Sequence, residues 1–479
     1  MVKMEAELSK SATEPQGGSD QTSSHTVESD GTGHVSDPFI HCSVLTEQNA
    51  PVLRVPMAGR SGAPEDALAA TNEIGYRNAV RDLGHMIPGV DFDALSNDTD
   101  SARFQIFEVP DETIQSFDIA SEIGAALSRD MPYPKTSLAS GGETGHKRGD
   151  AFLRGVMRSK GAGVSQVRSG PLAQLLRTDH SFILNSFDLH SEPTGQFAGL
   201  LERVFGVNTN VNTYLSCGSA EGFGAHWDNH DVLILPLVGS KTWRIYEPVD
   251  IVPHTRVYGP SAVTDRLVWE GEIAPGMGLF IPRGYGHLVS GNDALSIHHT
   301  VGINRLIAAS VISRAFSLSF RRPRMRANYP RELTETPTSY QGSVFDNRDA
   351  LLAELSEIVD EGALEANWAL SRSTVPPRNW GSFEQTWTAL ASGNWDNARI
   401  RLVAPTGVHL GPEYGNAVAF AAAGRLMTVL KECLEPFWAL ASGEPTTVSA
   451  LPDCSPGSLT KEEFVSGMVL RGLVEVGKP

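Results

Sequence analysis

Cysteine is scarce in this chain, and its few positions are far apart. The 479 residues contain four cysteines, at Cys42, Cys217, Cys433 and Cys454. No two of them form the C-x-x-C pair typical of thiolate zinc sites and redox motifs, and their spacing is not that of a disulfide framework. We therefore expect a reducing, cytoplasmic environment.

Long hydrophobic runs and excess positive charge are also missing. No apolar run approaches the ~20 residues that a membrane span requires, and residues 1–37 lack the apolar segment of a signal peptide. Their Ser, Thr, Gly, Asp and Glu residues predict a disordered tail. With 39 Lys and Arg against 56 Asp and Glu, the net charge is −17. We expect no membrane and no nucleic-acid partner, whereas a basic protein would suit this charge.

Strand-forming residues are concentrated in residues 209–303. Short β-branched or aromatic runs alternate there with Gly, Pro, Asn and Ser: "VNTYLS", "DVLILPLVG", "KTWRIYEP", "GLFIPRG" and "ALSIHHTVGI". Short strands at such close spacing predict a sandwich or barrel. Residues 181–206 precede them and predict a short strand, a turn containing proline and an amphipathic helix.

Helical periodicity dominates after residue 303. Two helix candidates, "NRLIAASVISRAFSLSF" and "NRDALLAELSEIVDEGALEANWAL", lie within residues 304–375. In residues 376–479, the stretch 415–443 is a long helix candidate. These patterns predict a mixed α+β fold with a β-rich core followed by a helical segment.

The last residues predict a helix, a turn and a strand in that order. Thr460 and Glu463 form a capping box, Gly472 ends the helix, and residues 473–476 form the strand. This order resembles part of a winged helix. Because acidic and basic residues nearly balance in this region, we expect a protein-interaction or structural module rather than a DNA-binding one.

Ionisable residues cluster at 226–231, directly before an apolar run. Side chains at positions i and i+2 of a strand share a face, so His226 and Asp228 can bind one metal ion. His287, which follows a Pro-Arg-Gly turn, is the candidate third ligand. Two imidazoles and one carboxylate suit Fe(II) with three open positions, although zinc accepts the same ligands. These three residues are both the metal and the catalytic candidates.

Other histidines compete with this assignment. His298 and His299 are alternatives to His287 as third ligand, and one of them is expected to line the pocket. For His230 and Asp231 we favour a role in supporting the ligands or the fold.

Lys241 favours oxygen chemistry over zinc hydrolysis. The stretch "VLILPLVGSKTWRIY" predicts two antiparallel strands joined at Gly239-Ser240, which returns Lys241 to the level of the metal-binding strand. A buried lysine requires an anion, and the distal carboxylate of 2-oxoglutarate supplies one. Asn212, Tyr214 and His299 are further candidates for the cosubstrate pocket.

The stretch "NVNTYLSCGSAEGFGAHWDNHDVLILPLVGSKTWRIYEP", with "APGMGLFIPRGYGHLVS" and "SIHHTVGI", resembles the JmjC-type cupins (Cupin-4) of the ribosomal-oxygenase-like branch. The family pattern matches over about ninety residues, at Asn212, Tyr214, His226, Asp228, Gly239, Lys241, Trp243, Pro282, Gly284 and His287. The resemblance implies a double-stranded β-helix (jelly-roll, JmjC/cupin) core. It implies an oxygenase domain at 38–303 with its metal core at 209–303, a helical segment at 304–375 that forms a homodimer, and a winged-helix-like domain at 376–479.

The resemblance also implies an activity. The family members are 2-oxoglutarate-dependent dioxygenases that use Fe(II) and O2 to hydroxylate protein side chains, so a basic ribosomal protein is the candidate substrate. Two alternatives stay open: a tailoring hydroxylase of a peptide or small metabolite, and a non-catalytic cupin/winged-helix regulator. Two positions depart from the family pattern, Met277 in place of Asp and Pro236 in place of Gln. A proline removes a donor from the strand ladder and predicts a bulge or an edge.

Overall fold

The computed structural model describes residues 42–44, most of 64–319 and most of 381–477, with a few positions between 352 and 356. The tail expected at 1–37 lies outside the described residues. The second helix candidate of the 304–375 segment lies almost wholly outside them as well. In the first candidate, the structure confirms a helix, α7 (Ala308–Ser319).

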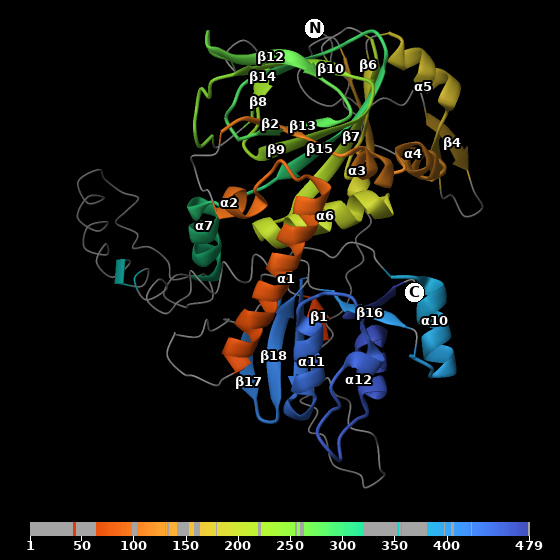
Figure 1. Ribbon diagram of the computed structural model, residues 1–479, viewed down its shortest axis with the longest axis vertical. Coiled ribbons are helices and arrows are strands. Elements are labelled where there is room, and N and C mark those ends of the chain that lie inside the picture. The colour runs from red at the N-terminus through yellow and green to blue at the C-terminus, as the bar shows by residue number, and fades with distance from the viewer. Residues whose placement is uncertain are drawn as a thin grey trace, which may run out of the picture. The chain divides into compact units, whose positions relative to one another are not determined.

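Two antiparallel sheets form the core of the molecule (Figure 1). The larger has the order β2-β13-β9-β15-β7-β6-β3, with bounds Gln105–Glu108, Met277–Ile281, Asp231–Val238, Leu295–Ile303, Thr209–Cys217, His180–Leu184 and Thr136–Ser140. The smaller has the order β11-β8-β14-β10-β12, with bounds Val257–Tyr258, His226–Trp227, His287–Gly291, Lys241–Tyr246 and Leu267–Ile273.

The strands of the core alternate between the sheets from β7 to β10 and again from β12 to β15, and the chain stays in the smaller sheet from β10 to β12. β7, β9, β13 and β15 lie in the larger sheet, and β8, β10, β12 and β14 lie in the smaller one. This alternation is the winding of a double-stranded β-helix, so the predicted cupin core is confirmed.

The predicted hairpin of β9 and β10 is wrong. β9 pairs with β13 and β15, whereas β10 pairs with β12 and β14. Seven of the eight β9 residues are buried, which requires a central strand covered on both faces, while β10 alternates buried and half-buried positions. The chain crosses between the sheets at Gly239, where φ is +60° and a Cβ would lie 2.1 Å from the Leu295 carbonyl oxygen. Only glycine fits this crossing.

The proline in β9 sits at a bulge, as its chemistry predicts. Pro236 pairs with His298, and the β9–β15 register shifts between Ile297 and His298. His298 and its neighbour His299 point to opposite faces of the sheet, as adjacent residues of a strand do.

Helices cover the larger sheet. The predicted amphipathic helix is α6 (Glu192–Phe205), which begins at the Ser191 cap and ends at Gly206 with φ +64°. It packs against β7, and its buried face joins the main core through Phe197 and Leu201. The same core takes in residues from α1 (Pro64–Met86), α2 (Phe92–Asn97), α4 (Ile119–Leu127) and α5 (Ser169–Leu176); α3 (Asp111–Ser116) packs beside them. A two-stranded sheet consists of β4 (Leu153–Met157) and β5 (Gly163–Val167).

A second core lies within residues 389–476. Its three-stranded sheet has the order β20-β16-β21 and its four-stranded sheet has the order β1-β19-β18-β17, with bounds Thr446–Thr447, Arg399–Leu402, Val474–Gly477, Cys42–Val44, Arg425–Leu430, Ala417–Ala422 and His409–Tyr414. The helices are α10 (Phe383–Ser392), α11 (Leu434–Ala441) and α12 (Lys461–Leu470). Because β1 pairs with β19, residues 42–44 belong to this sheet and not to the domain predicted from residue 38.

The long helix predicted at 415–443 is wrong in its first half. β18 pairs with β19 there, and the helical part is limited to a 3-10 turn at Lys431–Cys433 and α11. All six residues of β18 are buried, so packing overrides the helix preference of its alanines. By contrast, α12 has the predicted Thr460–Glu463 capping box, Gly472 follows it with φ +66°, and β21 comes next.

Candidate metal centre

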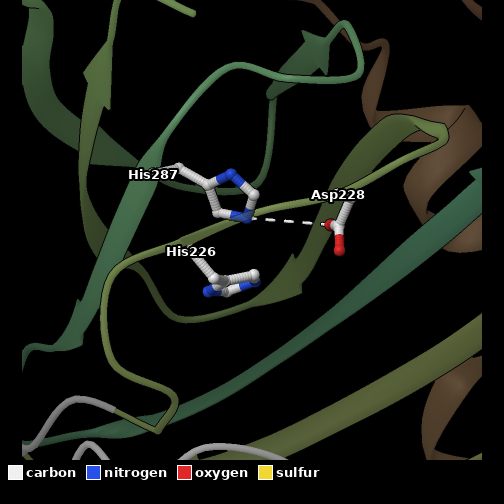
Figure 2. A group of neighbouring side chains, drawn as sticks. All are labelled: His226, Asp228 and His287. Carbon is white, nitrogen blue, oxygen red and sulfur yellow. Dashed lines mark ion pairs between the residues drawn. The ribbon is translucent and has the colours of Figure 1, made fainter. Parts of the chain in front are cut away.

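His226 and His287 face each other across neighbouring strands. His226 begins β8 and pairs directly with His287 at the start of β14, and their rings lie 4.2 Å apart between centroids. Asp228 follows β8, and its Oδ2 lies 3.9 Å from His287 Nε2 (Figure 2). One ligand atom from each residue lies within 4.8 Å of the others. The pairing of the short strand β8 with β14 thus brings the predicted triad together.

Backbone contacts orient both imidazoles for metal binding. His226 Nδ1 lies 2.9 Å from the Gly224 carbonyl oxygen, and His287 Nδ1 lies 3.2 Å from that of Tyr285. An Nδ1–H that donates to a carbonyl leaves Nε2 unprotonated as the ligand atom. The donor set therefore fits a divalent ion, with a carboxylate as the third ligand.

The protonation states of the triad also suit a metal ion. Burial lowers the pKa of His226 to about 3, and it lowers the pKa of His287 as well, so both rings are neutral at ordinary pH. Burial alone would raise the pKa of Asp228, but Arg256 and the two imidazoles together lower it. A divalent ion can therefore bind the two neutral imidazole nitrogens and the carboxylate without first displacing a proton from any of them.

A cavity of about 840 Å³, counted with its open mouth, contains the triad. Apolar side chains from both sheets line it beside the ligands, among them Val232, Ile234, Trp243 and Val289. A reacting group inside would be shielded from most of the solvent.

Lys241 lines the same cavity. It is the first residue of β10, it is only 9% exposed, and burial lowers the pKa of its ammonium group to about 8. Within the described part of the chain, no carboxylate lies in ion-pair range of its Nζ. A buried lysine without a protein counter-charge is a site for an anionic ligand.

Asn212 and Tyr214 reach the cavity from β7, as their spacing predicts. The Asn212 Oδ1 accepts a hydrogen bond from the Ser186 backbone nitrogen at 3.0 Å, which holds the amide in place. The Tyr214 ring stacks on His298 with centroids 5.0 Å apart. Both side chains are therefore held in place in the cavity that Lys241 also lines.

His299 does not reach the cavity, so its expected cosubstrate role requires correction. It is fully buried, hydrogen-bonds Thr213 and Thr194, and packs edge-on against Phe117. His298 lines the cavity in its place. The alternation of side chains along β15 could have predicted this placement, because His299 shares its face with the core residues Val301 and Ile303.

His230 and Asp231, which follow Asp228 in the chain, have different roles. His230 lines the cavity, while Asp231 forms a buried ion pair with Arg305 and accepts the Arg283 backbone N–H. Arg305 also donates to the Leu95 and Ser96 carbonyls, so this pair joins β9 to α2. The supporting role expected of Asp231 matches these contacts.

Arg256 is a charged cavity residue that the sequence did not reveal. Its Nε forms an ion pair with Asp228 Oδ1, and its side chain lines the cavity. It comes from the segment directly before β11, which pairs with β8. No local pattern in "PHTRVYGP" points to the site, because only the sheet pairing brings it there.

A double-stranded β-helix with two histidines and one aspartate converging in its cavity defines a cupin metalloprotein. The family model for the JmjC domain matches residues 184–311. These residues are therefore a JmjC domain, as the motif pattern predicted.

Three curated relatives match part of the chain. The bifunctional lysine-specific demethylase and histidyl-hydroxylase NO66 of Brugia malayi is 28% identical over 162 residues, 32% of this chain and 23% of that protein. Human ribosomal oxygenase 1 is 32% identical over 22% of this chain and 17% of its own length. Ribosomal oxygenase 2 of Bos taurus is 31% identical over 28% of this chain and 30% of its own. The chain thus covers less than a third of each of them.

Among solved structures, the ribosomal oxygenase YcfD of Escherichia coli in complex with cobalt and 2-oxoglutarate is similar to this chain with a TM-score of 0.49. It is 16% identical, and the match covers 81% of this chain and 99% of that one. No helix within the described residues is long and apolar enough to cross a membrane.

Proposed function

We propose that this protein is an Fe(II)- and 2-oxoglutarate-dependent dioxygenase that hydroxylates a protein side chain. The observation that carries the proposal is Lys241, a buried cation in the cavity that also holds His226, Asp228 and His287. Zinc-dependent hydrolysis requires the three ligands and a bound water but no buried ammonium group, whereas a dicarboxylate cosubstrate pairs with one. The JmjC match supports the same chemistry.

The residues divide the task between them. His226, Asp228 and His287 would hold the iron and leave adjacent positions for the cosubstrate and O2. When bound, iron with 2-oxoglutarate and O2 supplies the oxidising power, giving succinate, CO2 and a hydroxylated product. Lys241 binds and orients the distal carboxylate, and Asn212 and Tyr214 border its path.

The proposed substrate is a ribosomal protein. Two of the relatives are named ribosomal oxygenases, and the chain's net charge of −17 would attract a basic protein. Such steering raises the rate of encounter and leaves the choice of side chain to the cavity.

The remaining architecture is proposed to serve this activity. We assign the oxygenase domain to the described residues between 64 and 303, and a dimerisation role to 304–375. In 376–479, the helices α10, α11 and α12 with the three-stranded β20-β16-β21 sheet support a winged-helix-like interaction module, into which β17, β18 and β19 are inserted between β16 and α11. We place the protein in the cytoplasm.

Turnover without a known acceptor tests the reaction class. Purified protein with Fe(II) should convert 2-oxoglutarate to succinate in air and not under anaerobic conditions, and Asp228→Ala should not. Zinc-dependent hydrolysis with no succinate would contradict the proposal.

Proteomics of a deletion strain tests the substrate. Loss of a single-oxygen modification from one ribosomal protein, restored by wild-type protein and not by Asp228→Ala, is the expected result. If ribosomal proteins were unchanged while a peptide or metabolite lost oxygen, the tailoring hydroxylase would replace our assignment.

A further inference from the structure

Arg256 places a positive charge beside the metal ligands. Pairing of Tyr258 with His226 aligns β11 with β8 and brings Arg256 to Asp228. The Arg256 Nε contacts Asp228 Oδ1, whereas Oδ2 is the oxygen near His287. The Arg256 side chain is 33% exposed and lines the cavity, so a molecule in the cavity can contact it directly.

Lys241 lies away from the metal along β10. Ile245 of β10 pairs with His287, and Lys241 is four positions further along, opposite Gly291. At ~3.3 Å per residue this is about 13 Å of strand, a span that a long lysine side chain and a dicarboxylate fill together. A substrate side chain must therefore approach the metal from the rest of the cavity, on the side that Arg256 borders.

The wall on the substrate's side offers neutral polar groups in addition to Arg256. Asn210 and His230 line the cavity there. A Cβ at Gly302 would lie 2.8 Å from Asn210 Oδ1 and 3.0 Å from His230 Nε2, so this glycine leaves both groups in contact with the cavity. Among the described lining residues the carboxylate is Asp228, which the metal and Arg256 engage.

We propose that Arg256 determines the charge class of the accepted side chain: the site takes a neutral polar or acidic residue and rejects lysine, methyllysine and arginine. This rests on the proposed oxygenase function and narrows its substrate. A cation at the reacting position would meet Arg256 and the metal, and the described wall offers it no carboxylate other than Asp228, which both already engage. A carbonyl, an imidazole or a carboxylate would instead accept hydrogen bonds from its guanidinium.

Coulomb's law sets the size of the effect. Two unit charges about 6 Å apart at an effective dielectric constant of about 20 repel by an amount equal to ~100-fold in binding. Partial neutralisation of Arg256 by Asp228 reduces this, so we expect at least ~10-fold discrimination.

The test measures peptide binding without turnover. Protein is loaded with Co(II) and N-oxalylglycine, an unreactive analogue of 2-oxoglutarate, and the Co(II) absorption spectrum verifies loading. An immobilised sample is then exposed to an equimolar library of peptides with random flanks and a central His, Asn, Asp, Lys, trimethyllysine or Arg. Retained peptides are quantified by mass spectrometry.

Three variants accompany the wild type. Arg256→Gln removes the charge, Arg256→Lys retains it, and Arg244→Gln is the matched control. Arg244 belongs to the same sheet, is 37% exposed and pairs with Glu270 outside the cavity. Circular dichroism verifies that each variant is folded.

Wild type, Arg256→Lys and Arg244→Gln should retain neutral and acidic centres at least ~10-fold better than cationic ones, and Arg256→Gln should lose most of that preference. Equal retention of cationic centres by the wild type, or an unchanged profile in Arg256→Gln, overturns the inference. Failure of wild type to bind Co(II) or form succinate would instead overturn the proposed function.

Discussion

Replacing Lys241 with methionine separates two effects of the buried cation: its cost in folding free energy and its contribution to binding 2-oxoglutarate. Burial lowers the pKa of Lys241 from 10.5 to about 8. At ~1.4 kcal/mol per tenfold change in acidity, retaining the charge in the cosubstrate-free protein costs about 3 kcal/mol below pH 8. Methionine has a similar length and no charge, so the variant should be more stable than wild type by about 1 to 3 kcal/mol at pH 7.

The sign of the pH dependence follows from proton linkage. Because the folded-state pKa lies below the unfolded value, the unfolded chain binds more protons between pH 8 and 10.5, and the folded wild type becomes relatively more stable across that window. The advantage of Lys241→Met is therefore largest below pH 8 and disappears by about pH 10.5. Wild-type affinity for 2-oxoglutarate should fall above pH 8, because the ammonium group is lost there.

Thermal unfolding with and without Mn(II) and 2-oxoglutarate measures both effects. In the wild type, the transition that the ligands shift identifies the JmjC core, and at 100 times the Kd it should gain ~2.7 kcal/mol. Lys241→Met should unfold at a higher temperature without ligand and should not respond to 2-oxoglutarate.

The control is Lys431→Met, since Lys431 is 42% exposed and pairs with Glu413 at the surface. Its stability should change by less than ~0.5 kcal/mol. A methionine variant at position 241 that is less stable than wild type and still binds 2-oxoglutarate would refute the reasoning.

Three further outcomes are expected. Asp228→Ala should lower Co(II) affinity by at least ~100-fold, because a charged ligand is lost; isothermal titration measures it, and unchanged affinity would place the metal elsewhere. Burial lowers the pKa of both His226 and His287, so Co(II) absorption should be retained well below pH 6.5, and a midpoint near 6.5 would show that the rings are not buried as described. Arg305→Met leaves Asp231 buried without its partner and should cost about 3 kcal/mol in urea unfolding. A loss under ~0.5 kcal/mol would mean that the pair does not hold β9 to α2.

Local sequence was a reliable guide where neighbouring residues decide the structure. The Thr460–Glu463 box, the Ser191-capped helix and the alternation in β7 depend on residues a few positions apart. The same local rules failed at 415–443, because burial of β18 in a sheet outweighs the helix preference of alanine.

By itself, the sequence determined the chemistry of this protein: two histidines and an aspartate with metal-ligand character, and a lysine in apolar company. Only the tertiary structure decided which groups meet. It separated β9 from β10, turned His299 into the core while His298 lines the cavity, and brought Arg256 to Asp228. The physical reason is that the separation of β9 from β10 and the position of Arg256 depend on strand pairing between distant segments, which is settled by burial of the whole sheet and leaves no trace in the adjacent residues. The placement of His299 did leave a local signal, because it alternates with the core residues Val301 and Ile303 along β15.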